Sequence, residues 1–269
     1  MYKGLPLALA FASLPTFAAP QLASEIQAGE SWISVGISQT DVEYDHKNPN
    51  TGYTESDKLS SDDFAFSGLF ALENTGSFLP VIALTFNNEK EESDTSKIFT
   101  GQFGLIKEQS NGKKMGLFVE YNHSDNPDAT RGSYGAGFLL QTSDNLSKNY
   151  NQLKFTIDIP KSEGDTKGGR SLAITNTLKV ASSNEIDFEL QAALGMVSDI
   201  DFKNQDLKAD NDLVFGLAGK IYFNLDPSLT ISVGLSKIFG GTTYTNSLGG
   251  ELNTDIESTE IGAQIISRF

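Results

Sequence analysis

Apolar residues recur at every second position in most of this chain from Trp32 onward, with small or polar residues between them. Successive side chains of a β-strand point to opposite faces, so this spacing gives a strand one apolar face and one mild face. In the segment 212–223 the two faces are Leu213, Phe215, Leu217, Gly219, Ile221 and Phe223 against Asp212, Val214, Gly216, Ala218, Lys220 and Tyr222. Sustained helical periodicity is absent after the first twenty residues, which predicts an all-β fold.

Twelve segments of this kind are predicted as strands, each about as long as a tilted strand must be to cross a bilayer. Their ranges are 32–43, 63–73, 78–88, 97–107, 114–124, 132–142, 150–160, 170–181, 185–197, 210–224, 228–239 and 255–269. Beyond the first twenty residues no apolar run is long enough for a membrane helix. A mature chain that spans a bilayer must then be a closed barrel, because only closure satisfies every backbone group in lipid.

The predicted connections alternate between long and short. Long polar loops are expected at 45–61, 89–96, 161–169, 198–209 and 240–254, and tight turns at 74–76, 111–112, 181–184 and 226–228. Outer-membrane barrels have short periplasmic turns and longer outside loops. With an even strand count, both termini are expected on the periplasmic side.

A soluble β-sandwich also alternates, and two features favour lipid instead. The polar face of the strands has few long charged side chains, as expected of a narrow lumen, and outward aromatic residues gather near strand ends. Three features fit less well. Asn176 and Lys237 fall on the apolar face, and the inner face of 78–88 is apolar at Leu79, Val81 and Ala83, which a shifted register or a bulge would explain.

The first residues are interpreted as a signal peptide. Lys3 gives a positive start, 5–17 is apolar, and small residues follow at Ala18 and Ala19. A buried first helix is the alternative, which Pro6 and Pro15 disfavour. The expected organisation is a signal peptide at 1–19, a short periplasmic lead at 20–30 and one barrel at 31–269.

The last ten residues, from Glu260 to Phe269, resemble the closing strand of Gram-negative outer-membrane β-barrels. Phe269, Ile265, Ala263 and Ile261 match that pattern, whereas Ser267 departs from it. The resemblance is to the porin-like superfamily and identifies no particular family. It implies an antiparallel transmembrane β-barrel, location in the bacterial outer membrane and recognition by the barrel-assembly machinery.

Composition excludes several classes. The net charge of −15 repels nucleic acid, whose phosphates need a basic face. The absence of cysteine excludes disulfides, thiol catalysis and thiolate-ligated metals. His46 and His123 are the only histidines and have no ligand-like partners in the sequence, so neither a metal site nor a cofactor is expected.

Some charged residues fall on the predicted inner face. These lumen candidates are Glu120, Lys154, Asp158, Lys179, Asp187, Glu189, Lys220 and Glu260. Reflecting the chain about the turn at 181–184 places Lys179 close to opposite Asp187. One interpretation is structural ion pairing across the wall of the lumen. The other is a constriction that selects solutes by charge.

Two families of twelve-stranded barrels fit the residues poorly. Acid-sugar channels line their lumens with arginine, whereas this chain has only Arg131, Arg170 and Arg268. The outer-membrane phospholipases place His and Ser two positions apart on the lipid face. Here Ser124 directly follows His123 and therefore lies on the opposite face, so the nucleophile is missing where the geometry needs it.

The favoured hypothesis is a passive outer-membrane channel for small polar solutes. A non-conducting barrel that acts in adhesion or envelope structure through its outer loops is the alternative, and a lipid hydrolase is a distant third. The expected partners are outer-membrane lipid, lipopolysaccharide and the assembly machinery. Carboxylates predicted in the outer loops, such as Glu89 and Asp199, either bind divalent cations that bridge to lipopolysaccharide or form a solvated acidic surface.

Overall fold

The structure is a computed structural model of the chain. It describes residues 28–269 apart from 92–93, 110–112, 127–128, 144–149, 161–165, 182, 184, 203–205 and 212, and at some strand positions, 158 among them, only the backbone. The expected signal peptide and most of the expected lead lie outside the described residues. The first strand begins at Ser31.

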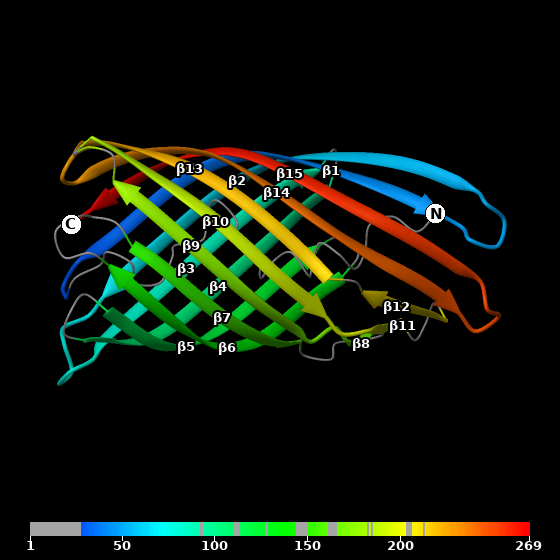
Figure 1. Ribbon diagram of the computed structural model, residues 1–269, viewed down its shortest axis with the longest axis horizontal. Helices are drawn as coiled ribbons and strands as arrows, with labels where there is room; N and C mark the ends of the chain where they lie inside the picture. Colours follow the sequence, from blue (N-terminus) through cyan, green and yellow to red (C-terminus); the bar gives the residue numbers. More distant parts are fainter. Residues whose placement is uncertain are drawn as a thin grey trace.

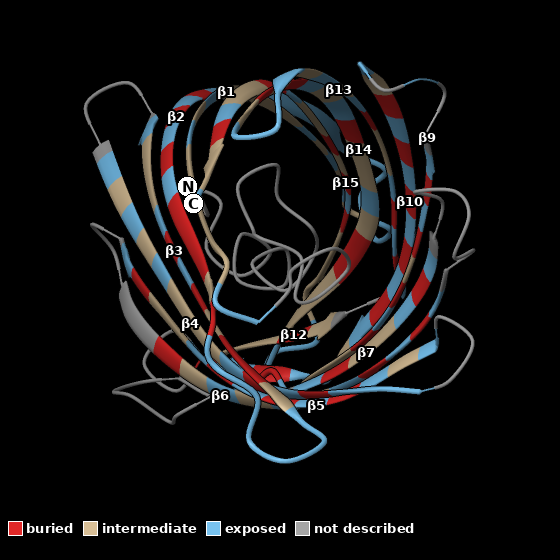
Figure 2. Ribbon diagram, turned by 90° about the vertical axis from the view of Figure 1, so that its left-hand side faces the viewer, coloured by how far each residue is buried: buried red, intermediate tan, exposed pale blue. Residues whose placement is uncertain are grey.

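The described residues form one antiparallel sheet that closes on itself (Figure 1 and Figure 2). Its elements are β1 (Ser31–Lys47), β2 (Thr54–Ala71), β3 (Leu79–Glu91), β4 (Asp94–Glu108), β5 (Lys113–Asn126), β6 (Ala129–Ser143), β7 (Tyr150–Pro160), β8 (Thr166–Gly168), β9 (Ser171–Ala181), β10 (Ile186–Val197), β11 (Ile200–Phe202), β12 (Leu207–Asn211), β13 (Leu213–Asp226), β14 (Leu229–Asn246) and β15 (Glu251–Arg268). β1 pairs with β15 along its length, which closes the ring. No helix among the described residues is long and apolar enough to cross a membrane.

The three short elements continue longer strands. β11 and β12 pair with Ile200 opposite Ala209, which preserves the register that sets Met196 opposite Leu213 in β10 and β13. The pairing of β8 with β11 keeps the register of β9 with β10 in the same way. The fifteen described elements therefore make twelve wall strands, and the predicted closed barrel of about twelve antiparallel strands is confirmed.

Large apolar side chains cover the outside of all twelve wall strands. Ile37, Leu117 and Leu190, for example, are 66%, 70% and 62% exposed. The positions between them point inward and are mostly buried, as the strict alternation along β10 illustrates. A water-soluble protein rarely exposes so continuous an apolar surface, whereas the hydrocarbon of a bilayer requires one. The outward face is therefore a lipid-facing belt.

Several strands extend well beyond this belt. β1 has 17 residues, and β2, β14 and β15 have 18, whereas a crossing needs about ten. The expected long loops at 45–61, 89–96 and 240–254 are consequently wrong, because most of these residues belong to hairpins (Figure 1). Above the lipid the outward positions become polar, so the apolar alternation that marks a strand is lost although the pairing continues.

The polarity of the two faces reverses in the strand extensions beyond the belt. We call these extensions, which include the β11–β12 hairpin, the outer hairpins. Ile200, Phe202 and Ala209 form a buried inward cluster, against which Leu207 and Tyr244 pack. The outward side is charged and carries exposed ion pairs, as in a soluble sheet. This reversal marks where the lipid belt ends and water begins.

One such ion pair centres on Lys208. Its Nζ lies 2.9 Å from Asp199 and 2.7 Å from Asp210, and both carboxylates raise the pKa of Lys208. On the first hairpin Lys58 likewise lies 3.0 Å from Glu43. All of these groups are well exposed, so the pairs contribute little stability each.

The two polar residues expected on the outward face do lie there. Asn176 Nδ2 donates a hydrogen bond of 3.0 Å to Asn151 Oδ1, which lies on the same face of the neighbouring strand. Lys237 forms an ion pair with Glu257 and lies 5.2 Å from the centroid of the Phe239 ring. Each is therefore satisfied by a neighbour rather than left bare in lipid.

The apolar inner face of β3 needs neither a shifted register nor a bulge. β3 pairs without interruption with both β2 and β4. Leu79, Val81 and Ala83 point inward because they pack in an apolar cluster with residues of β2, β4, β5 and β6. The explanation by a shift is thus wrong: one part of the lumen wall is apolar.

The lipid-facing belt predicts that a charged side chain introduced on the outside of β5 destabilises the barrel by an amount that depends on its depth in the bilayer. Val119 lies in the middle of the outward face, whereas His123 lies four residues further toward the outer end. We expect Val119→Arg to reduce the free energy of folding into lipid vesicles by about 2–4 kcal/mol, and His123→Arg by no more than about 1 kcal/mol. Urea titrations measure both values, and equal costs would contradict the position of the belt.

Candidate functional site

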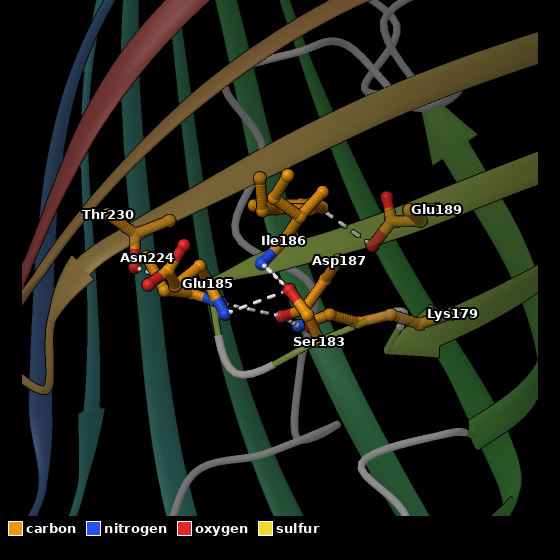
Figure 3. A network of polar contacts seen from close by, with 9 residues as sticks. Lys179, Ser183, Glu185, Ile186, Asp187, Glu189, Asn224 and Thr230 are labelled. Atoms are coloured by element: carbon orange, nitrogen blue, oxygen red, sulfur yellow. Dashed lines mark hydrogen bonds and ion pairs between the residues drawn. The ribbon is translucent and has the colours of Figure 1, made fainter.

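Charged and amide side chains gather on the inward faces of β9, β10, β13 and β14 (Figure 3). Lys179 Nζ lies 3.4 Å from Asp187 Oδ2, and Asn224 Nδ2 donates a hydrogen bond of 3.1 Å to the same oxygen. Thr230 Oγ1 donates to Asn224 Oδ1 at 2.9 Å. This network therefore connects four consecutive strands of the wall. We call it the basic–acidic network.

The short connection between β9 and β10 brings these groups together. Ser183 Oγ accepts hydrogen bonds from the backbone N–H groups of Glu185 at 3.2 Å and Ile186 at 3.0 Å. The two strands then pair so that Lys179 lies opposite Glu189, one inward position beyond Asp187. The turn thus fixes which charges meet.

Glu189 lies at the centre of the network. Its register partners are Lys179 on β9 and Lys220 on β13. Tyr222 Oη donates to Glu189 Oε2 at 3.1 Å, and Lys179 Nζ lies 4.9 Å from the centroid of the Tyr222 ring. Lys179, Glu189 and Lys220 are only 4%, 3% and 6% exposed. Buried charges of both signs at such distances must be paired to persist.

Part of the wall formed by β2 to β6 has the opposite character. There an apolar cluster of buried inward residues is formed by Leu69, Ala71, Val81, Ala83, Ile106, Phe118 and Leu139, and Trp32 packs against them. Two cations border this apolar wall. Lys154 Nζ lies 4.8 Å from the centroid of the Phe118 ring, and the Arg268 guanidinium lies 4.6 Å from that of Trp32. The inner face of the lumen thus has a polar part and an apolar part.

Carboxylates occupy the inner face further toward the outer end. Glu120 accepts hydrogen bonds from Gln102 Nε2 at 2.6 Å and Asn122 Nδ2 at 3.1 Å. Glu260 accepts one from Ser236 Oγ at 3.4 Å. These hydrogen-bond donors are neutral amide and hydroxyl groups.

The structure gathers only part of the predicted lumen set. Lys179, Asp187, Glu189 and Lys220 form the basic–acidic network. Glu120 and Lys154 also point inward but lie apart from that network. Glu260 points inward on β15, two strands from Lys220 of the network. The side chain of Asp158 is outside the described residues.

Two inward carboxylates were not among the predicted lumen residues. Asp63 is 8% exposed and was expected only as the first residue of a strand. Glu89 was assigned to a solvated outer loop, but it points inward on β3 and accepts a hydrogen bond of 3.1 Å from Ser61. The alternation of side chains along each strand could have identified both residues. Asp63 lies on the same face of its strand as Ala65, and Glu89 lies on the same face as Thr85.

The remaining residues considered for chemistry are placed as follows. His123 points outward, with its ring stacked 6.4 Å from that of Tyr121, whereas Ser124 points inward and is 8% exposed. The described residues contain no group of three or more His, Asp or Glu side chains arranged to hold a metal ion. Phe269 points outward and is 65% exposed, and its backbone exchanges hydrogen bonds of 2.8 and 2.9 Å with Ser31.

Comparisons with known proteins give structural matches only. No family model matches the chain, and no curated protein matches its sequence. The COG4313 outer membrane channel from Pseudomonas putida F1 aligns with a TM-score of 0.68 at 11% identity, over 93% of this chain and 99% of that one. A FadL homologue from Pseudomonas aeruginosa aligns with a TM-score of 0.48 at 8% identity, over 91% of each chain.

A deletion mutant of the monoaromatic hydrocarbon channel TodX aligns with a TM-score of 0.49 at 6% identity, again over 91% of each chain. Identities this low establish the fold alone, and only the first of these alignments is close enough to use. That alignment shows that this chain has the closed β-barrel fold of the outer membrane channel, in agreement with the lipid-facing belt.

Proposed function

We propose that this protein is a passive outer-membrane channel for small polar solutes. The observation that carries the proposal is the inner face: twelve strands enclose side chains that are charged or hydrogen-bonding over much of their length. Lining a lumen with such groups is costly unless they contact water or one another. A water-filled path for solutes gives these groups a use that a purely structural barrel lacks.

The contrast between the two walls supports passage of small molecules. The basic–acidic network offers donors and acceptors of both signs, while the apolar cluster on β2 to β6 offers none. A small polar solute that moves along the charged wall can replace its hydrating water molecules with hydrogen bonds to these groups. Because each of these many contacts is weak, the solute can both enter and leave. The lumen is therefore expected to favour solutes by polarity and size rather than by one tight site.

A structural or adhesive barrel is the second candidate. The observation that favours it is the length of the outer hairpins, whose charged outward faces project beyond the lipid belt. Such a barrel would present these hairpins to a partner and would conduct no ions.

Planar bilayers separate the two candidates. We expect the purified protein to give current steps of reproducible size, and a silent membrane would support the structural role. Because the chain contains no cysteine, Ala218→Cys provides a clean inward probe, and Leu217→Cys on the adjacent outward position is its control. A cationic methanethiosulfonate reagent should reduce the steps of the Ala218→Cys variant only.

The role of the basic–acidic network is tested by stability. Lys179→Met leaves Asp187 buried without its cation, which should cost about 3–5 kcal/mol. Lys179→Met combined with Asp187→Leu removes both charges and should cost clearly less. Urea unfolding in lipid vesicles measures both. An unchanged midpoint for Lys179→Met, together with a changed ion selectivity, would instead assign the network to solute selection.

The terminal residue is proposed to act in assembly. Phe269 lies exposed at the end of β15, at the seam where β1 and β15 close the barrel. We expect deletion of Phe269 to lower the yield of folded barrel in outer membranes severalfold. Refolding of the purified variant into lipid vesicles should remain close to normal, and a matching loss in vitro would mean that the residue acts through stability instead.

A further inference from the structure

Lysines gather around the connection between β4 and β5. Lys107, Lys113 and Lys114 lie within eight positions of a chain that has 20 Lys and Arg residues against 35 Asp and Glu. Lys114 lies opposite Glu108, an oppositely charged cross-strand pair that is favourable in a sheet. β4 ends and β5 begins at the same end of the barrel as the start of β1 and the end of β15. Positive charge is thus concentrated at the end that carries the termini.

Two of these lysines point outward, toward the lipid. Lys107 continues the outward series of Phe103 and Leu105, and Lys113 continues that of Met115. Both lysines are exposed. Lys107 lies opposite Met115, and Lys113 is the next outward residue of the same strand, so the two lysines are diagonal neighbours with Cα atoms about 7–8 Å apart. Their long side chains can therefore reach a single group at the edge of the belt.

The register partners of these two lysines are neutral residues. Lys107 lies opposite Met115 on β5, and its Nζ lies 5.8 Å from the centroid of the Phe78 ring. Lys113 lies opposite Thr142 on β6. An ammonium group over the face of an aromatic ring keeps its positive charge available to an anion. The pair is therefore placed to attract a negatively charged group from outside the wall.

Outward lysines at the opposite end of the barrel have a different setting. Lys90 on β3 lies opposite Asp62, and Lys97 on β4 lies opposite Asp125. Cross-strand neighbours of opposite charge contribute to the stability of the sheet itself. β4 thus carries a lysine that faces an acid at one end and a lysine that faces a neutral residue at the other. The second setting favours an external anion as the partner.

The surroundings of Lys107 and Lys113 fit a phospholipid. Leu105, Met115 and Leu117 cover the belt directly beside the two lysines and are 41%, 46% and 70% exposed. Lysine stems lie along such apolar surface while their ammonium groups reach the headgroup level, where aromatic rings also collect. The phosphate of a glycerophospholipid lies at this level, and lysine binds phosphate as a point charge.

We propose that Lys107 and Lys113, together with the Phe78 ring, form a binding site for the headgroup of an anionic glycerophospholipid. The lipid belongs to the membrane leaflet at the end of the barrel that carries the termini, and its acyl chains lie against Leu105 and Met115. The site is on the outside of the wall, so it does not depend on the proposed channel function.

Lipid titration tests the site directly. The protein in detergent is titrated with phosphatidylglycerol, and native mass spectrometry measures the Kd of the first bound lipid. We expect this Kd to rise about fivefold in Lys107→Gln and about 25-fold when Lys113→Gln is added, since each lysine near a membrane surface contributes about 1 kcal/mol to binding an anionic lipid. Lys107→Arg combined with Lys113→Arg keeps both charges and should bind nearly as well as the original chain.

A matched control separates this site from the effect of net charge. Lys90→Gln combined with Lys97→Gln removes two exposed outward lysines at the other end of the barrel and changes the net charge equally. We expect the Kd for phosphatidylglycerol to stay within twofold in this variant. An equal rise in both double glutamine variants would overturn the proposal, as would tighter binding of lipid A than of phosphatidylglycerol. The titration requires no conductance, so a silent bilayer would leave its result unaffected.

Discussion

The pairing of the first strand with the last is the interaction on which the rest of the structure depends. β1 and β15 match continuously from Trp32 opposite Arg268 to Lys47 opposite Asn253. Without this seam, two strand edges would expose unpaired backbone groups to hydrocarbon, where each costs several kcal/mol. Closure also creates the lumen, because it assigns one face of every strand to the inside. Both the belt and the inner polar groups follow from it.

Once the sheet is closed, each inward charge must find its partner around the wall. Lys179, Asp187, Glu189 and Lys220 do so on adjacent strands, where cross-strand pairs of opposite sign are held by register. Asp63, further toward the outer end, accepts hydrogen bonds from the hydroxyl groups of Ser38 and Thr40 instead. In our proposal the buried charge pairs stabilise the wall.

The end of the lipid belt divides the molecule into two physical regimes. Within the belt the apolar side chains point outward, as Leu117 and Leu190 do. In the outer hairpins they point inward, as Ile200 and Phe202 do, and ion pairs such as Lys208 with Asp199 cover the outside. The same alternation of side chains serves both regimes, since only the solvent outside the wall has changed.

The sequence by itself determined the fold class, the twelve wall strands and the face on which most residues lie, because side-chain alternation is a local property of a strand. It also brought Lys179 near Asp187, since a short turn fixes the register of its two strands. It did not reveal that Glu89 faces the lumen beside Asp63, because polar hairpins above the lipid lose the apolar signal that marks a strand. Contacts between distant segments, such as the pairing of Thr40 on β1 with Glu260 on β15, were decided only by closure, which no local pattern records.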